Sequence, residues 1–159
     1  MYHLHTLDII KAITSVPQLF IDHDSVGAED IWKSIHSNSN ISGGLNSLIF
    51  ASNGKENAKD KGHTTAASLF AIQKVVEVFD PVNGNKERVI RLRDMGEKLD
   101  WTGDWSASST KWSPELKEHL QYNQTFREGS YTFYMSFDDY ITYYNSTCIV
   151  KLHNSPKSQ

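Results

Sequence analysis

Hydrophobic residues near the start of the chain recur at the spacing of helices. Residues 4–14 carry an aliphatic side chain at every third position, which predicts a short amphipathic helix that ends before Pro17 and packs on a sheet. Residues 31–37 predict a second helix, because Ile31 and Ile35 share one face and Asp30 can cap the first turn.

The middle of the chain is typical of strands. The mostly apolar residues 45–51 predict a buried strand, and the charged residues 52–62 predict a loop. Residues 68–79 and 88–93 are rich in Val and Ile, and residues 80–85 between them have the Pro and Asn-Gly chemistry of a hairpin turn. Apolar and basic side chains alternate along the second of these strands, in the order Ile90, Arg91, Leu92 and Arg93. We therefore expect one face of this strand to be buried and the other to meet water or a polar site.

The last third of the chain predicts two helix starts and two strands. The motif Ser113-Pro114-Glu115 supplies a capping hydroxyl, a proline suited to the first helical position and an acid at the positive end of the dipole. Ser136-Phe137-Asp138-Asp139 has the spacing of a capping box, and it lies between predicted strands at residues 131–135 and 147–152. Since the elements show no βαβ rhythm, we predict an α+β domain of antiparallel, sandwich-like β-sheets with short flanking helices.

The composition narrows the classes of partner. The 159 residues suffice for one domain, and 16 Lys and Arg against 19 Asp and Glu leave a formal charge of −3, with no basic stretch that could follow a phosphate backbone. We expect no nucleic acid partner. The single cysteine, Cys148, excludes an internal disulfide and suits a reducing compartment. Because the start lacks a signal peptide's features and no apolar run could cross a bilayer, we expect an intracellular, cytoplasmic protein with no membrane partner; no residue supports a cytoskeletal or ciliary setting.

Several separated segments combine arginine and tryptophan residues in recognisable motifs. Arg91-Leu92-Arg93 is followed by Trp101-Thr102-Gly103-Asp104-Trp105-Ser106 and then by Trp112. This order resembles the motifs R-(L/I)-R-N-P-W-G and W-x-G-x-W-S, and the tryptophan after them, in the protease core of calpains, which are papain-like cysteine proteases. Tyr134-Met135-Ser136-Phe137-Asp138-Asp139-Tyr140 resembles W-M-S-F-x-D-F. The resemblance implies that residues 20–153 form the second, His- and Asn-bearing protease subdomain, between an N-terminal helix and connector at 1–19 and a polar tail at 154–159.

The catalytic residues of such a protease are only partly represented. A papain-like protease needs a thiolate, a histidine that activates it and a third group that orients the histidine. In the family the cysteine lies in the preceding subdomain, to which nothing in this chain corresponds. We interpret Cys148 as a small buried residue of the last strand.

Two alignments compete for the histidine, which the family carries in G-H-A-Y-S-V. Pairing the family residue with His63 requires two extra residues directly after it, at the mouth of a strand. Keeping the strand in register instead places Thr65 at that position and removes the general base. We favour Thr65, and His63 stays the alternative.

The third catalytic position also differs from the family. Asp94 stands where the family has asparagine, and an aspartate can still orient an imidazole. Met95 and Gly96 then replace proline and tryptophan, so the ring that covers the histidine–asparagine contact in the family is missing.

The resemblance also implies a calcium site, which is incomplete in this sequence. Calcium takes about six to eight oxygen ligands. Asp100 and Glu128 fit two of the family's acidic positions, whereas Ala107 and Ser130 replace two others. We expect no cofactor, with at most a weak calcium site at the vestigial positions Asp100 and Glu128.

These observations support one favoured function and one alternative. The favoured hypothesis is a non-catalytic calpain-like domain, a structural or protein-binding module of a larger protein or assembly, with other protein chains as partners and no small-molecule substrate. Its catalytic positions, Thr65 or His63 and Asp94, would then be vestigial. The alternative is the His-bearing half of a calcium-dependent cysteine endopeptidase, with His63 as the base and Asp94 as its orienter. In that case a cysteine-bearing half on another chain or upstream segment completes the enzyme.

A third hypothesis is a carbohydrate-binding sandwich that uses its tryptophans as stacking platforms. It requires the rings of Trp101, Trp105 and Trp112 to be coplanar and open to solvent. We expect these rings to be packed instead.

Overall fold

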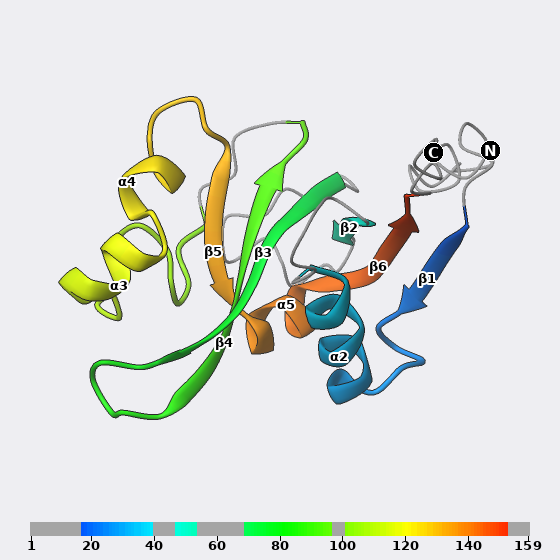
Figure 1. Cartoon of the computed structure of the whole chain (residues 1–159), viewed down its shortest axis with the longest axis horizontal. Helices are drawn as coiled ribbons and strands as arrows, with labels where there is room; N and C mark the ends of the chain where they lie inside the picture. Colours follow the sequence, from blue (N-terminus) through cyan, green and yellow to red (C-terminus); the bar gives the residue numbers. More distant parts are fainter. Residues whose placement is uncertain (1–16, 40–46, 54–68, 97–100, 153–159) are drawn as a thin grey trace, which may run out of the picture.

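The computed structural model describes residues 17–39, 47–53, 69–96 and 101–152. In this part of the chain six antiparallel strands form one sheet in the order β1-β6-β2-β3-β4-β5 (Figure 1). The strands are β1 (Gln18–Asp22), β2 (Ser47–Asn53), β3 (Leu69–Phe79), β4 (Lys86–Asp94), β5 (Thr132–Ser136) and β6 (Tyr144–Lys151). The helices are α2 (Ala28–Ser39), α3 (Pro114–His119), α4 (Tyr122–Thr125) and α5 (Phe137–Tyr143). The predicted α+β class with an antiparallel sheet and short helices is confirmed.

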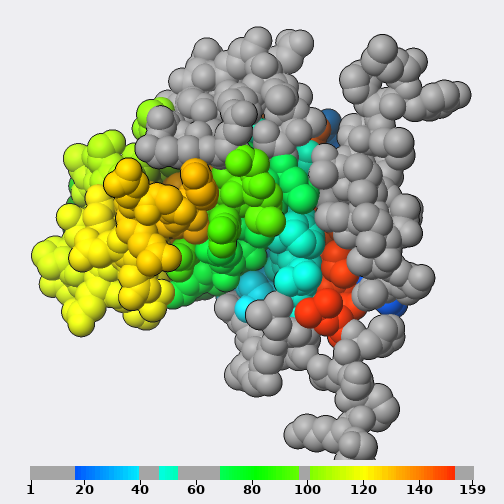
Figure 2. Space-filling view, turned by 90° about the horizontal axis from the view of Figure 1, so that it is seen from above, coloured from blue at the N-terminus to red at the C-terminus, as the bar shows by residue number. Residues whose placement is uncertain are grey.

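Apolar side chains pack on both faces of the sheet. On one face Ile31 and Ile35 of α2 join the buried aliphatic residues of the central strands, and α5 packs beside β4. On the other face a second cluster includes Trp105, Trp112 and Tyr134. Figure 2 shows α3, α4 and β5 gathered at one end of the molecule, away from β6. The second cluster therefore occupies the β4–β5 end of the sheet.

The β3–β4 hairpin contains a register shift. Ile72 pairs with Leu92, but Lys74 pairs with Arg91, so Gln73 is an extra residue on β3. The bulge shifts the alternation of faces by one residue, so Ile72 and Val75, which are three residues apart, both lie in the cluster under α2. Ile90 and Leu92 are fully buried, whereas Arg91 is half-buried and Arg93 is exposed. This confirms the two-faced strand that the sequence predicts.

The predicted helix caps are confirmed at two of three places. The hydroxyl of Ser113 accepts the Leu116 N–H at the start of α3, and the hydroxyl of Ser136 accepts the Asp139 N–H at the start of α5. These bonds satisfy backbone amides that have no partner within the helix.

The cap predicted at Asp30 is wrong. Helix α2 begins at Ala28, and the N–H groups of Asp30 and Ile31 both bond to the carbonyl of Gly27. Asp30 lies within the first turn, where its negative charge still suits the positive end of the helix dipole.

The strands β2 and β6 are displaced from the predicted ranges, and β1 and α4 were not predicted. The helix predicted at 4–14 and most of the loop predicted at 52–62 lie outside the described residues.

Candidate functional site: the position of the protease centre

Asp94 occupies the end of β4, opposite Phe70 near the start of β3. Its backbone N–H donates to the carbonyl of Tyr131 at 2.9 Å, and its carboxylate Oδ1 accepts the N–H of Gly96 at 2.9 Å. Asp94 is 7% exposed. The turn that follows the strand thus helps to hold a buried carboxylate in a fixed orientation.

A buried tyrosine lies beside this carboxylate. Burial raises the pKa of the Tyr144 hydroxyl well above its ordinary value, and Tyr140 and the negative charge of Asp94 add to the rise. The side chain of Tyr144 is fully buried in the core under α5. Asp94, the residue predicted at the third catalytic position, therefore borders the hydrophobic core.

The histidine position lies outside the described residues. Both His63 and Thr65 fall there, so the contact of either residue with Asp94, and the choice between the two alignments, stay predictions. Next to Asp94, Met95 is 54% exposed. Met95, at the proline position of the family motif, thus extends into solvent, and Gly96 at the tryptophan position has no side chain that could cover a contact.

Cys148 lies on the opposite face of the sheet from Asp94. A row of cross-strand partners on one face runs from Thr147 through Ala51 and Phe70 to Asp94. Cys148 follows Thr147 in β6, and successive side chains of a strand point to opposite faces. The thiol packs in a small apolar cluster with Val150 and is 1% exposed. The interpretation of Cys148 as a buried residue of the last strand is confirmed.

Ser130 and Ala107, which replace two of the acidic calcium positions of the family, take part in hydrogen bonds within the chain. The hydroxyl of Ser130 donates to the carbonyl of Thr125 at 2.5 Å, and the carbonyl of Ala107 accepts the Tyr122 hydroxyl at 2.6 Å. Glu128 is exposed, and Asp100 lies outside the described residues. Nowhere among the described residues do three His, Cys, Asp or Glu side chains gather as metal ligands would. Glu128 is therefore the only one of the predicted acidic calcium positions that the described residues include, and a weak calcium site stays a prediction.

The tryptophan segment, residues 101–112, is a packing element. Its three rings are 0–8% exposed, and the planes of Trp105 and Trp112 meet at 87°. A side chain at Gly103 would have its Cβ 2.2 Å from the ring of Trp101, which explains the glycine of the W-x-G motif. The carbohydrate-platform hypothesis is therefore wrong, because these rings are neither open nor coplanar.

An ionic cluster that the sequence did not reveal fastens this segment to the hairpin. Lys111 Nζ bonds to Glu87 Oε1 and lies 3.3 Å from both Asp80 Oδ2 and Asp104 Oδ2. The indole N–H of Trp105 donates to Glu87 Oε2 at 2.8 Å. Burial alone would lower the pKa of Lys111, but hydrogen bonds to Glu87 and Asp80 and the nearby negative charges raise it above its ordinary value.

A buried histidine was also missed. His23 follows β1, and its ring nitrogens lie 2.8 Å from the carbonyl oxygen of Tyr144 and 2.7 Å from the hydroxyl of Thr147. Because both nitrogens are engaged, His23 serves to join β1 to β6 within the core. The local sequence around His23 does not distinguish it from a surface histidine, because its burial depends on the pairing of β1 with β6.

Comparison with known proteins supports the family resemblance. A family model described as calpain family cysteine protease matches residues 2–151. The chain is similar to human calpain-14, with 35% identity over 100 residues, which are 61% of this chain and 13% of that protein. It is similar to rat calpain-8, with 33% identity over 62% of this chain and 12% of that protein. It is also similar to the human calpain-2 catalytic subunit, with 33% identity over 44% of this chain and 10% of that protein.

Each match thus spans only about a tenth of the relative's own length. In the part of the chain that the structure describes, no helix has the length and apolar character that crossing a membrane requires.

Proposed function

Because the chain belongs to the calpain family of cysteine proteases, we propose that it is a non-catalytic domain of this family that serves as a structural or protein-binding module of a larger protein or assembly. Its partners in this proposal are other protein chains. The single buried thiol suits a reducing compartment, so we place the domain in the cytoplasm.

The position of the chain's only thiol is the observation that carries this proposal. Cys148 lies on β6 and Asp94 on β4, three strand steps apart in the sheet and on opposite faces. Three steps of about 4.8 Å separate the two strands by about 14 Å. A thiolate must lie within hydrogen-bond reach of the base that activates it. Cys148 therefore cannot act at a centre built around Asp94.

The scaffold supports a binding or structural role. The tryptophan segment, its glycine and the cap at Ser136 all pack or bond as a stable domain requires. The structural part of the family motifs is thus retained, whereas the nucleophile and the indole next to Asp94 are absent from the chain. A chain that keeps the residues of the fold but not those of the reaction is better suited to a structural or binding role than to catalysis.

One observation favours a second candidate function, the His-bearing half of a cysteine endopeptidase. The carboxylate of Asp94 is buried and is held by the N–H of Gly96. Such a carboxylate can orient an imidazole and fix its tautomer. In this alternative His63 is the base, and a cysteine-bearing half on another chain or upstream segment supplies the nucleophile.

A reconstitution experiment separates the two functions. The chain is mixed with the preceding, cysteine-bearing half of a calpain, and hydrolysis of a fluorogenic peptide is followed with calcium present. The second half of the same calpain serves as the positive control. We expect no hydrolysis with this chain. Hydrolysis that disappears in the variant His63→Ala would refute the non-catalytic proposal and establish the alternative.

A further inference from the structure

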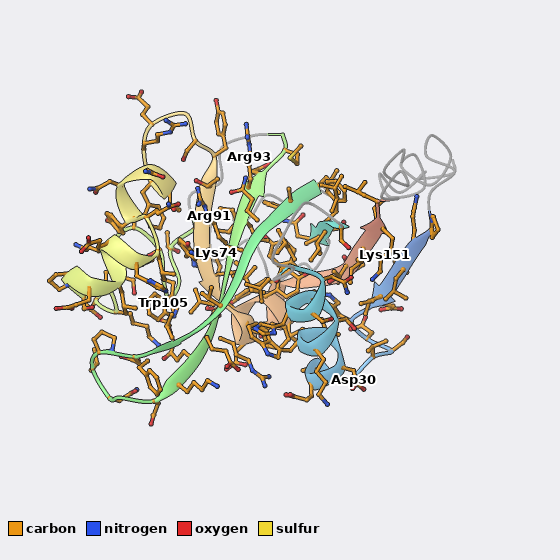
Figure 3. The ribbon with its side chains drawn as sticks, in the orientation of Figure 1. Asp30, Lys74, Arg91, Arg93, Trp105 and Lys151 are labelled. Carbon is orange, nitrogen blue, oxygen red and sulfur yellow. The ribbon has the colours of Figure 1, made fainter. Side chains whose placement is uncertain are left out.

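Three basic side chains follow one another on one face of the β3–β4 hairpin. Arg91 and Arg93 lie two residues apart on β4, and Lys74 of β3 is the cross-strand partner of Arg91. We call these three residues the cationic stripe. Figure 3 shows them in succession along the two strands. Arg93 is exposed, and Lys74 and Arg91 are half-buried.

Among the described residues, the cationic stripe has none of the acidic partners that Arg88 and Lys86 of the same hairpin possess. Arg88 pairs with Glu29 and Glu77, and Lys86 pairs with Glu77. In contrast, none of the three stripe residues forms an ion pair within the described ranges. The Nε of Arg91 is also buried without a hydrogen-bond partner there.

With the described residues alone, the positive charges of Lys74 and Arg91 repel each other. Like charges directly opposite each other on neighbouring strands destabilise a sheet. Partial burial lowers the pKa of Lys74, and the positive charge of Arg91 lowers it further. An anion bound across the stripe would relieve this repulsion, since it would stabilise the charged form of Lys74.

The spacing within the cationic stripe indicates the shape of that anion. Arg91 and Arg93 lie on one face of β4 two residues apart, at about 6.8 Å, and Lys74 lies beside Arg91 on β3, about 5 Å across the sheet. An extended peptide presents its own alternate side chains at the interval that separates Arg91 and Arg93. We infer that the cationic stripe binds an extended acidic segment of a partner protein, in which one Asp or Glu faces Arg93 and the next but one faces the pair of Arg91 and Lys74.

Charge and size favour a peptide over a nucleic acid. Three cations can neutralise only a few phosphates of a polymer, whereas they suffice for the two or three carboxylates of a short acidic segment. The inference rests on the proposed function in one respect: it names the chemistry of the partner that the proposed binding module would take. The peptide titration below needs no proteolysis, so its result is independent of the reconstitution experiment.

The test is fluorescence anisotropy of the full 159-residue chain with a labelled peptide in which glutamate alternates with threonine. Two comparison peptides carry glutamine in place of glutamate, or the same glutamates in one contiguous block. We expect the alternating glutamate peptide to bind most tightly, and its affinity to fall as salt rises. K74Q or R93Q should each weaken binding about threefold, and the double variant about tenfold.

The matched control is K33Q, which removes one positive charge from an exposed position of α2, on the other face of the sheet. Its affinity should stay within about twofold of the original chain. Circular dichroism confirms that each variant keeps its fold. Equal losses in K33Q and R93Q, equal binding of the glutamine peptide or the contiguous peptide, or preferential binding of single-stranded RNA would overturn the inference.

Discussion

Replacing Lys111 with methionine should destabilise the domain by about 2 kcal/mol. Methionine keeps most of the apolar stem and removes only the charged group. The side chain of Lys111 is 18% exposed, and it neutralises the carboxylates of Asp80, which is 2% exposed, and Glu87, which is 19% exposed. Removing one partner of a fully buried pair costs about 3–5 kcal/mol, and an exposed pair contributes about 0–1 kcal/mol. The cluster lies between these limits, which gives the expected value.

Urea unfolding followed by tryptophan fluorescence measures this change, because the indole N–H of Trp105 bonds to Glu87 of the same cluster. A double-mutant cycle of Lys111→Met with Glu87→Gln should yield a coupling energy of about 1 kcal/mol. Lys117→Met provides a matched control at an exposed helix position. A loss below about 0.5 kcal/mol for Lys111→Met, comparable to the control, would refute the view that the cluster fastens the tryptophan segment to the hairpin.

The same variant should change the response of the domain to acid. A hydrogen bond from the Val82 N–H and the proximity of Lys111 lower the pKa of Asp80. A carboxyl group with a lowered pKa stabilises the fold above its ordinary pKa of about 4, and this contribution disappears as the pH falls through the folded-state value. Without Lys111 the folded-state pKa rises, so the acid-induced loss of stability should begin at a higher pH. An identical acid profile for both proteins would contradict this assignment.

Three further outcomes follow from the packing of the described residues. Gly103→Ala should lower the free energy of unfolding in urea by about 2 kcal/mol, because its Cβ meets a buried indole, whereas Thr102→Ala at an exposed position should change it by less than about 0.5 kcal/mol. Cys148 should resist a thiol reagent in the native domain and react fully in urea; rapid labelling of the native protein would contradict its burial. In a spectrophotometric titration Tyr140 and Tyr144 should stay protonated until the domain unfolds, since burial raises the pKa of both hydroxyl groups. The stability that the two neutral hydroxyls provide is complete below a pH of about 10 and declines above it. Ionisation of either tyrosine in the folded domain near a pH of about 10 would contradict this expectation.

The sequence predicted elements with local signals and missed those that depend on distant partners. The α3 and α5 caps are local, because a hydroxyl bonds to an amide three residues later. The β3–β4 hairpin is also local, since its turn chemistry lies between its strands. In contrast, β1 pairs only with β6, at the far end of the described chain, and its short length gives little periodicity. Asp30 was assigned as a cap because the preceding Gly27 carries no side-chain acceptor to mark the true helix start.

The candidate site follows the same rule. Motif spacing located Asp94 at the end of a strand and the tryptophans in the core, because both depend on short segments of sequence. The partners of Lys111 could not be predicted, since Asp80 and Glu87 reach it only after the hairpin folds against the tryptophan segment. Lys74 was likewise not connected with Arg91, because their pairing depends on the register of the whole hairpin, which runs without a shift from the turn at Phe79 and Lys86 back to Lys74.

The bulge at Gln73 means that one residue of β3 can be spared without changing the partners of the others. If Gln73 were deleted, Lys74 would follow Ile72 directly and would still pair with Arg91, so the ladder would become regular and every pair would be kept. If Gln73 instead paired with Arg91, Lys74 would face Ile90 and its ammonium would be directed at the aliphatic core beneath α2. A single-codon deletion of Gln73 should therefore be tolerated better than deletion of a paired residue of this strand.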